Sequence, residues 1–113
     1  MINLKVDEGY AFDYLAILEV KKNNNPNQTQ LWLDCSACLS DQLSKELWDD
    51  LILSKEYENM VTVNQKTFIA VDKARYGETT AKEVDNCNME RYNAKQRLRN
   101  KFFPKSNKTE FKT

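Results

Sequence analysis

The chain has 113 residues, its 17 Lys and Arg are balanced by 17 Asp and Glu, and 41% of its residues are hydrophobic. This length suits one small domain with its own core. With only two Gly and two Pro, a β-sandwich or β-barrel with many tight turns is disfavoured, and helices fit better. The absence of His removes the Ser–His and Cys–His nucleophile pairs, His-ligated zinc and the usual general base near neutral pH.

The hydropathy and the net charge of the chain limit the compartment and the partners that we expect. No window approaches the roughly 18 consecutive apolar residues of a membrane span, and the first residues lack a basic start followed by an apolar run. We therefore expect a cytoplasmic protein with no membrane partner. A net charge of zero provides no global attraction to phosphate backbones, so nucleic acid is not an expected partner. The basic and aromatic run at residues 95–105 is interpreted as a helix C-terminus, with nucleic acid or an acidic partner as the alternative.

The N-terminal half predicts an arm and two helices. Residues 1–8 are expected to form a short extended arm, because residues 2–6 alternate apolar with polar side chains. Asp7 can cap a helix over residues 10–22, which is apolar almost all round and should be the most buried element. The Asn-rich run around Pro26 predicts a loop at 23–30. A short helix over residues 30–39 follows.

The C-terminal half predicts further helices. Ser40 is a candidate N-cap, and residues 41–76 have the apolar spacing of one long helix or two abutting ones. Gly77 is typical of the left-handed residue that follows a helix. Thr80 and Glu83 then form a capping-box pattern for a helix that runs to about Phe102, before a polar tail at 104–113.

These elements predict a mostly α fold, with residues 1–113 as a single domain. We expect a bundle of three to four helices with a short N-terminal extended arm, in which the last helix packs antiparallel after the Gly77 turn.

One face of the last predicted helix is unexpectedly polar. Asn88, Arg91 and Lys95 fall on the same side of a helical wheel as the apolar residues that should face the core. A buried cation needs an anionic partner, because an unpaired charge in a core costs several kcal/mol. Asp13 and Glu19 of the first helix are the candidate partners.

Two interpretations of this polar stripe remain open. In the first, the residues form a structural ion-pair network between the first and last helices, or the cations extend to solvent from a half-buried position. In the second, Asn88, Arg91 and Lys95 project into a cleft and bind an anionic ligand such as a nucleotide or sugar phosphate. The exposure of Arg91 distinguishes the two.

Other candidate chemistry is weaker. Cys35 and Cys38 form a CxxC with Cys87 far along the chain, but three cysteines without His leave a zinc site one ligand short. We expect three reduced, core-packed cysteines and no metal or cofactor. The carboxylates lack the ExxE spacing of a magnesium-dependent nucleotide pyrophosphohydrolase, so we interpret them as solvated and assign no catalytic residues.

Several short motifs carry a family resemblance. Residues 9–21 match a GxxxDxLxILExK opening, Leu47-Trp48-Asp49 matches a central LW followed by an acidic residue, and Glu110 and Lys112 match an acidic-Lys ending. With the NxxRxxxK formed by Asn88, Arg91 and Lys95, they occur in the same order as in an uncharacterised family of small helical proteins of bacteria and phages, often encoded near surface-polysaccharide genes, which this chain resembles.

The resemblance implies a polar site without naming its activity, because the family has none established. Its motifs single out six residues of this chain: Asp13, Glu19, Lys21, Asn88, Arg91 and Lys95. We therefore expect a small helical protein that acts by binding a protein or a small anion. A homodimer is compatible with the number of large aromatic side chains.

Overall fold

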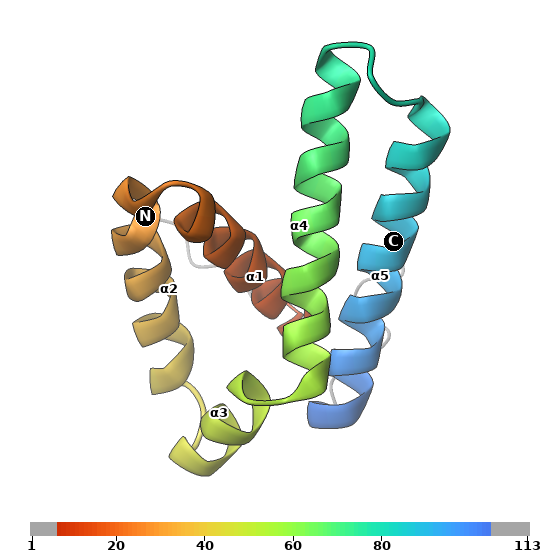
Figure 1. Ribbon diagram of the computed structural model, residues 1–113. Helices are drawn as coiled ribbons and strands as arrows, with labels where there is room; N and C mark the ends of the chain where they lie inside the picture. The colour runs from red at the N-terminus through yellow and green to blue at the C-terminus, as the bar shows by residue number, and fades with distance from the viewer. Residues whose placement is uncertain (1–6, 105–113) are drawn as a thin grey trace.

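The computed structural model describes residues 7–104, which form an all-helical fold without strands (Figure 1). Within this range there are five α-helices and one short 3-10 helix: α1 (Glu8–Asn24), η1 (Pro26–Gln28), α2 (Thr29–Asp41), α3 (Lys45–Ile52), α4 (Lys55–Arg75) and α5 (Ala81–Phe102). None of them combines the length and the apolar character that crossing a bilayer requires. Residues 1–6 of the predicted arm at 1–8, and the tail beyond 104 with its acidic-Lys ending, lie outside the described residues. The end of the predicted arm is wrong, because Glu8 is already the first residue of α1 and Asp7 is its N-cap.

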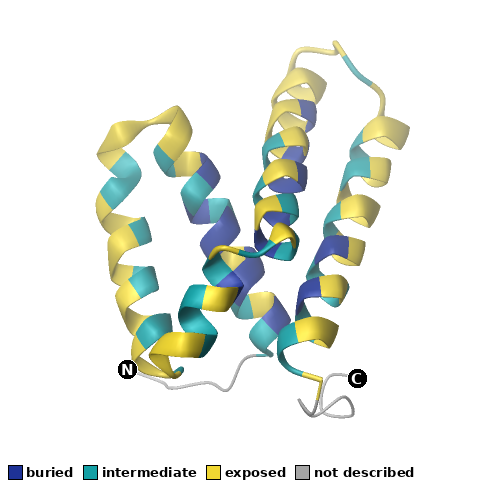
Figure 2. Ribbon diagram, turned by 60° about the horizontal axis from the view of Figure 1, so that its bottom comes forward, coloured by how far each residue is buried: buried dark blue, intermediate teal, exposed yellow. Residues whose placement is uncertain are grey.

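The helix α1 lies between α2 and a long hairpin formed by α4 and α5. It contacts all three of these helices, while α3 packs on α4 (Figure 1). The largest fully buried side chains come from all these elements except α2: Phe12, Leu15, Leu51, Met60 and Leu98. The buried positions of α1 face the hairpin of α4 and α5 (Figure 2). The turn that joins α4 to α5 is largely exposed. The expected burial of the first helix is therefore confirmed.

The predicted loop at 23–30 is wrong for most of its length. The helix α1 continues to Asn24, and only Asn25 separates it from η1 and α2. The Asn25 side chain accepts a hydrogen bond from the Asn27 N–H (3.1 Å), and Pro26 occupies the first position of η1, where its missing N–H costs nothing. The run that predicts a loop thus ends one helix and starts the next.

The middle of the chain forms two helices, which raises the number of α-helices above the three to four expected. Ser40 lies inside α2 and does not cap a helix. Instead, the Ser44 hydroxyl accepts a hydrogen bond from the Leu47 N–H, and the Ser54 hydroxyl accepts one from the Tyr57 N–H, both at 3.1 Å. Each serine satisfies a free N–H group at a helix start, so residues 41–76 divide into α3 and α4.

The turn into α5 forms as predicted, except that the capping box is not completed. Gly77 has a φ of 69°, in the left-handed region that glycine adopts without strain. The Thr80 hydroxyl accepts a hydrogen bond from the Glu83 N–H (3.2 Å). The Glu83 carboxylate bonds to the Thr79 hydroxyl and does not complete the capping box. The helix ends at Phe102, which confirms the expected boundary.

Gly9 allows the start of α1 to approach α5 closely. A Cβ at this buried position would lie 3.1 Å from Lys95 Cγ and 3.2 Å from Arg99 Cβ, which is tighter than most real contacts. Next to it, Arg99 Nε lies 2.6 Å from Asp7 Oδ1, and both side chains are largely buried. The N-terminus of α1 is therefore held directly against the last helix.

We expect the substitution Gly9→Val to lower the free energy of unfolding by about 1–3 kcal/mol, because the added methyl groups force α1 away from α5. Urea unfolding followed by circular dichroism measures this change. Ala11→Val is the matched control, since it places the same β-branched side chain at a half-buried position of the same turn. Equal losses in the two variants would contradict close packing at Gly9.

Candidate functional site

An ion pair joins the first and last helices. The Arg91 Nε donates to Asp13 Oδ1 and Oδ2 at 3.3 and 3.2 Å, and the Arg91 Nη2 donates to Asp13 Oδ2 at 3.1 Å. The Asp13 side chain is 7% exposed and that of Arg91 is 34% exposed. The structure thus pairs Arg91 with one of its two expected partners, in the forked geometry that suits guanidinium and carboxylate groups.

A third helix contributes to the same carboxylate. The Asn64 Nδ2 of α4 donates to Asp13 Oδ1 at 3.0 Å and to the Met60 carbonyl oxygen at 2.9 Å, and Asn64 is buried. Asp13 therefore links α1, α4 and α5. Asn64 is a site residue that the sequence patterns did not single out. Its position within the apolar spacing of residues 57–71 is the signal that could have identified it.

Glu19, the other expected partner of Arg91, lies in a different contact. Its carboxylate accepts a hydrogen bond from the hydroxyl of Tyr57 at 2.8 Å. Tyr57 is only 4% exposed, and this burial, with the neighbouring Glu19 carboxylate, raises the pKa of its hydroxyl. Glu19 thus satisfies a buried donor of α4 and does not belong to the Asp13–Arg91 site.

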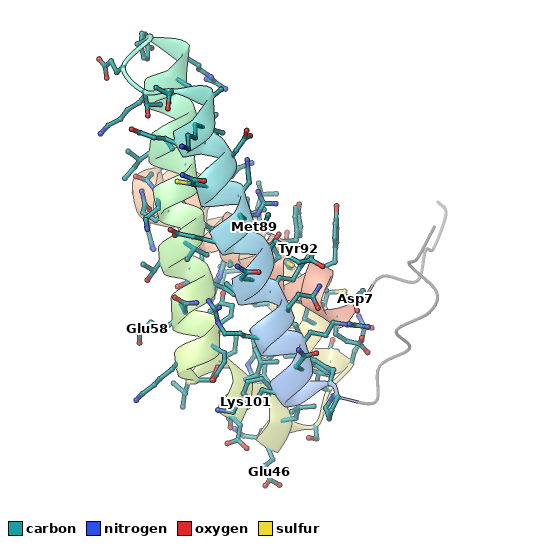
Figure 3. All side chains as sticks on the ribbon, turned by 90° about the vertical axis from the view of Figure 1, so that its right-hand side faces the viewer. Asp7, Glu46, Glu58, Met89, Tyr92 and Lys101 are labelled. Atoms are coloured by element: carbon teal, nitrogen blue, oxygen red, sulfur yellow. The ribbon has the colours of Figure 1, made fainter. Side chains whose placement is uncertain are left out.

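Lys95 lies beside the ion pair and contacts aromatic rings instead of a carboxylate. Its Nζ is 5.8 Å from the ring centre of Tyr10 and 5.4 Å from that of Tyr92, both within cation–π range. The rings of Tyr10 and Tyr92 are more than half exposed. Figure 3 shows Tyr92 on the side of α5 near α1. Lys95 is half-buried and has no ion pair within residues 7–104, so the expected cluster of Asp13, Arg91 and Lys95 is only partly formed.

The three polar residues of α5 line one hollow. It has a volume of about 190 Å³, and its walls are Asp13, Asn88, Arg91, Tyr92 and Lys95. The exposed Asn88 lies at its edge. The helical spacing of the polar stripe therefore places these side chains together against α1, where their net charge is positive.

Lys21, the last of the six motif residues, lies at a second hollow between α1 and α4. This groove has a volume of about 260 Å³ and mostly apolar walls. Arg91 lines both hollows, because its side chain crosses from α5 toward Asp13. Arg91 thus lines both a small polar hollow and a larger apolar groove.

The cysteines are less buried than expected. All three are free thiols: Cys35 and Cys87 are half-buried, and Cys38 is exposed. Cys35 packs against the hydrophobic core, so the expectation of core-packed cysteines holds for Cys35 and is wrong for Cys38. Burial, with a smaller contribution from Cys38, raises the pKa of Cys35. A protonated thiol is a weak nucleophile and a poor metal ligand. Across residues 7–104, no three Cys, Asp or Glu side chains gather closely enough to hold a metal ion.

Comparison with known proteins adds no relative: no protein family, curated protein or solved structure matches the chain. The family resemblance therefore rests on the motif residues alone. The structure divides these residues among three places: Asp13, Arg91, Asn88 and Lys95 at the polar hollow, Glu19 at Tyr57, and Lys21 at the groove. The cationic side chains at the polar hollow and at the groove suit the binding of an anion, whereas the Glu19 carboxylate does not.

We expect Asp13→Asn to lower the free energy of unfolding by about 1–3 kcal/mol. This loss of stability is smaller than the loss on breaking a fully buried ion pair, because Arg91 is one-third exposed and its cation is partly solvated. A double-mutant cycle with Arg91→Met isolates the coupling free energy of the pair. Lys66 and Glu90, which join α4 to α5 at 2.8 Å with both side chains about half exposed, provide the matched control cycle. A coupling at Asp13–Arg91 no larger than the control would contradict a structural role.

The raised pKa of Tyr57 predicts a loss of stability in alkali. Its stabilising contribution is complete below about pH 10, the pKa of a tyrosine in an unfolded chain, and is lost as the pH rises above that value. The expected slope is at most about 1.4 kcal/mol per pH unit. Tyr57→Phe should flatten this slope in urea unfolding between pH 9 and 11, whereas Tyr76→Phe, at a position 74% exposed, should leave it unchanged. The same alkaline slope in Tyr57→Phe would rule out Tyr57 as its source.

Proposed function

We propose that the protein acts by binding and not by catalysis, through the face that α1 and α5 form around Lys95. We call this the tyrosine–lysine face and define it by Tyr10, Tyr14, Tyr92, Lys95 and Asn88. The single observation that carries the proposal is that Lys95 lies over two half-exposed tyrosine rings at the edge of a polar hollow. Tyrosine side chains are enriched at recognition surfaces.

The contacts of α5 support a division between structure and recognition. Arg91 is bonded to Asp13 and links the helices, so most of its binding capacity is already used. Lys95 makes no ion pair in the described part of the chain and retains its charge for a partner. An acidic segment of another protein suits this face, because its carboxylates would meet Lys95 and its apolar groups would cover the tyrosine rings. The proposed setting is the cytoplasm, as the hydropathy of the chain suggests, of a bacterium or of a phage-infected cell, as the resemblance implies.

A second candidate function has one specific observation in its favour. The Arg91 Nη1 has no hydrogen-bond partner among residues 7–104, and the side chain is 34% exposed beside the polar hollow. A phosphate or carboxylate group held by Asn88, Arg91 and Lys95 would use this donor, as in a domain that binds a nucleotide or sugar phosphate. The Asp13 carboxylate in the same wall reduces the attraction.

Site-specific photo-crosslinking in the cells that make the protein tests the proposal. A photoreactive phenylalanine at Tyr14, on the tyrosine–lysine face, should give a crosslinked product, and the same group at Glu58 should not. Glu58 is exposed on α4, on the side of the hairpin away from α1 (Figure 3). Lys95→Met should remove the product without unfolding the protein, because Met preserves the packing of the lysine stem.

Each alternative outcome has a distinct signature. A crosslinked product that persists in Lys95→Met would contradict recognition through this face. A product with the mass of two copies of this chain would identify a homodimer. An increase in melting temperature with inorganic phosphate or ADP, lost in Lys95→Met, would favour the second candidate, since a ligand at 100 times its dissociation constant adds about 2.7 kcal/mol.

A further inference from the structure

The groove between α1 and α4 is distinct from the tyrosine–lysine face. The two helices diverge toward the C-terminal end of α1, and the groove lies in the angle between them (Figure 1). Its apolar walls include Ile17 and Val20 from α1 and Phe68 and Val71 from α4. Phe68 is 45% exposed and Val71 is 39% exposed. Apolar surface on two facing helices is therefore left in contact with water.

The same groove has an excess of positive charge. Lys21, Arg75 and Arg91 line it, and Asp72 is the one carboxylate among its described lining residues. Lys21 and Arg75 are exposed and form no ion pair within residues 7–104. The Asp13 carboxylate already compensates much of the Arg91 charge, so the excess of positive charge at the groove comes from Lys21 and Arg75. The cationic rim and the apolar walls together are complementary to an anion with an apolar body.

The volume of the groove favours a small molecule over a helix of another protein. About 260 Å³ is slightly below the range of about 300–1,000 Å³ for small-ligand pockets, which are mostly apolar with a few polar groups that orient the ligand. We propose that the α1–α4 groove binds a small organic anion with an aliphatic body, of the chemical class of a fatty-acid carboxylate. The aliphatic part packs against Val20, Phe68 and Val71, and the carboxylate lies between Lys21 and Arg75. This site is additional to the proposed function and lies on the other side of Arg91.

Three probes with the same ten-carbon chain test the proposal: decanoate, decanol and decyltrimethylammonium, each below its micelle-forming concentration. Methyl NMR of the full chain follows Ile17, Val20 and Val71, which line the groove. Decanoate should shift these signals saturably, decanol should bind more weakly, and the cation should not bind. Equal binding of all three probes, or no saturable shift with decanoate, would overturn the proposal.

Matched charge variants separate the groove from general electrostatics. Lys21→Gln with Arg75→Gln should weaken decanoate binding about 2- to 30-fold, as expected for the loss of two largely solvated ion pairs. Lys73→Gln with Lys82→Gln removes the same charge from exposed positions that do not line the groove, and should leave the dissociation constant nearly unchanged. Equal weakening in the two double variants would overturn the assignment of the head-group site.

A third variant and a control resolve the remaining outcomes. Val71→Glu places a negative charge on the wall at a position already 39% exposed, and should abolish binding while the circular dichroism spectrum is preserved. Unchanged affinity in this variant would overturn the site. Groove signals that shift with protein concentration alone would overturn it in favour of a second copy of this chain. Lys95→Met should bind decanoate normally, so failure at the tyrosine–lysine face and failure at the groove are distinguishable.

Discussion

The buried carboxylate of Asp13 is the interaction on which the arrangement of the helices depends. It accepts hydrogen bonds from Asn64 of α4 and from Arg91 of α5, while its own helix is packed on both. A carboxylate that is only 7% exposed needs such donors, because an unsatisfied charge in a core costs several kcal/mol. Apolar packing alone tolerates small rotations of a helix, whereas these directional bonds fix the rotation of all three helices about their axes.

The same constraint shapes the surface where binding is proposed. Since Arg91 reaches across to Asp13, its guanidinium group becomes a shared wall between the polar hollow and the apolar groove. The close approach of Gly9 to α5 brings Tyr10 over Lys95. Arg91, which bonds to Asp13, and Lys95, which belongs to the proposed tyrosine–lysine face, are thus one turn apart along α5. The rigid Asp13–Arg91 pair supports the exposed side chains beside it.

Sequence reasoning identified much of this architecture because many signals were local. The Thr80 cap, the left-handed Gly77 and the end of α5 at Phe102 each depend on residues within one or two turns. The loop predicted around Pro26 was wrong because the local signal is ambiguous. Asn and Pro stabilise helix starts as well as turns. The helical wheel of α5 correctly grouped Asn88, Arg91 and Lys95 on the side that faces α1.

The sequence by itself determined the helical class, the positions of most helix ends, and the need of a core-facing Arg91 for an anion, since these follow from periodicity, capping and the cost of burying charge. Only the tertiary structure decided which carboxylate met that need. Asp13 and Glu19 lie six residues apart on one helix and so point about 120° apart around its axis. The sequence does not say which of these two sides meets the last helix, and the packing of α1 on the hairpin brings Asp13 to Arg91 and Glu19 to Tyr57. Such pairings join residues 38 and 78 positions apart, and they depend on helix packing that no local signal encodes.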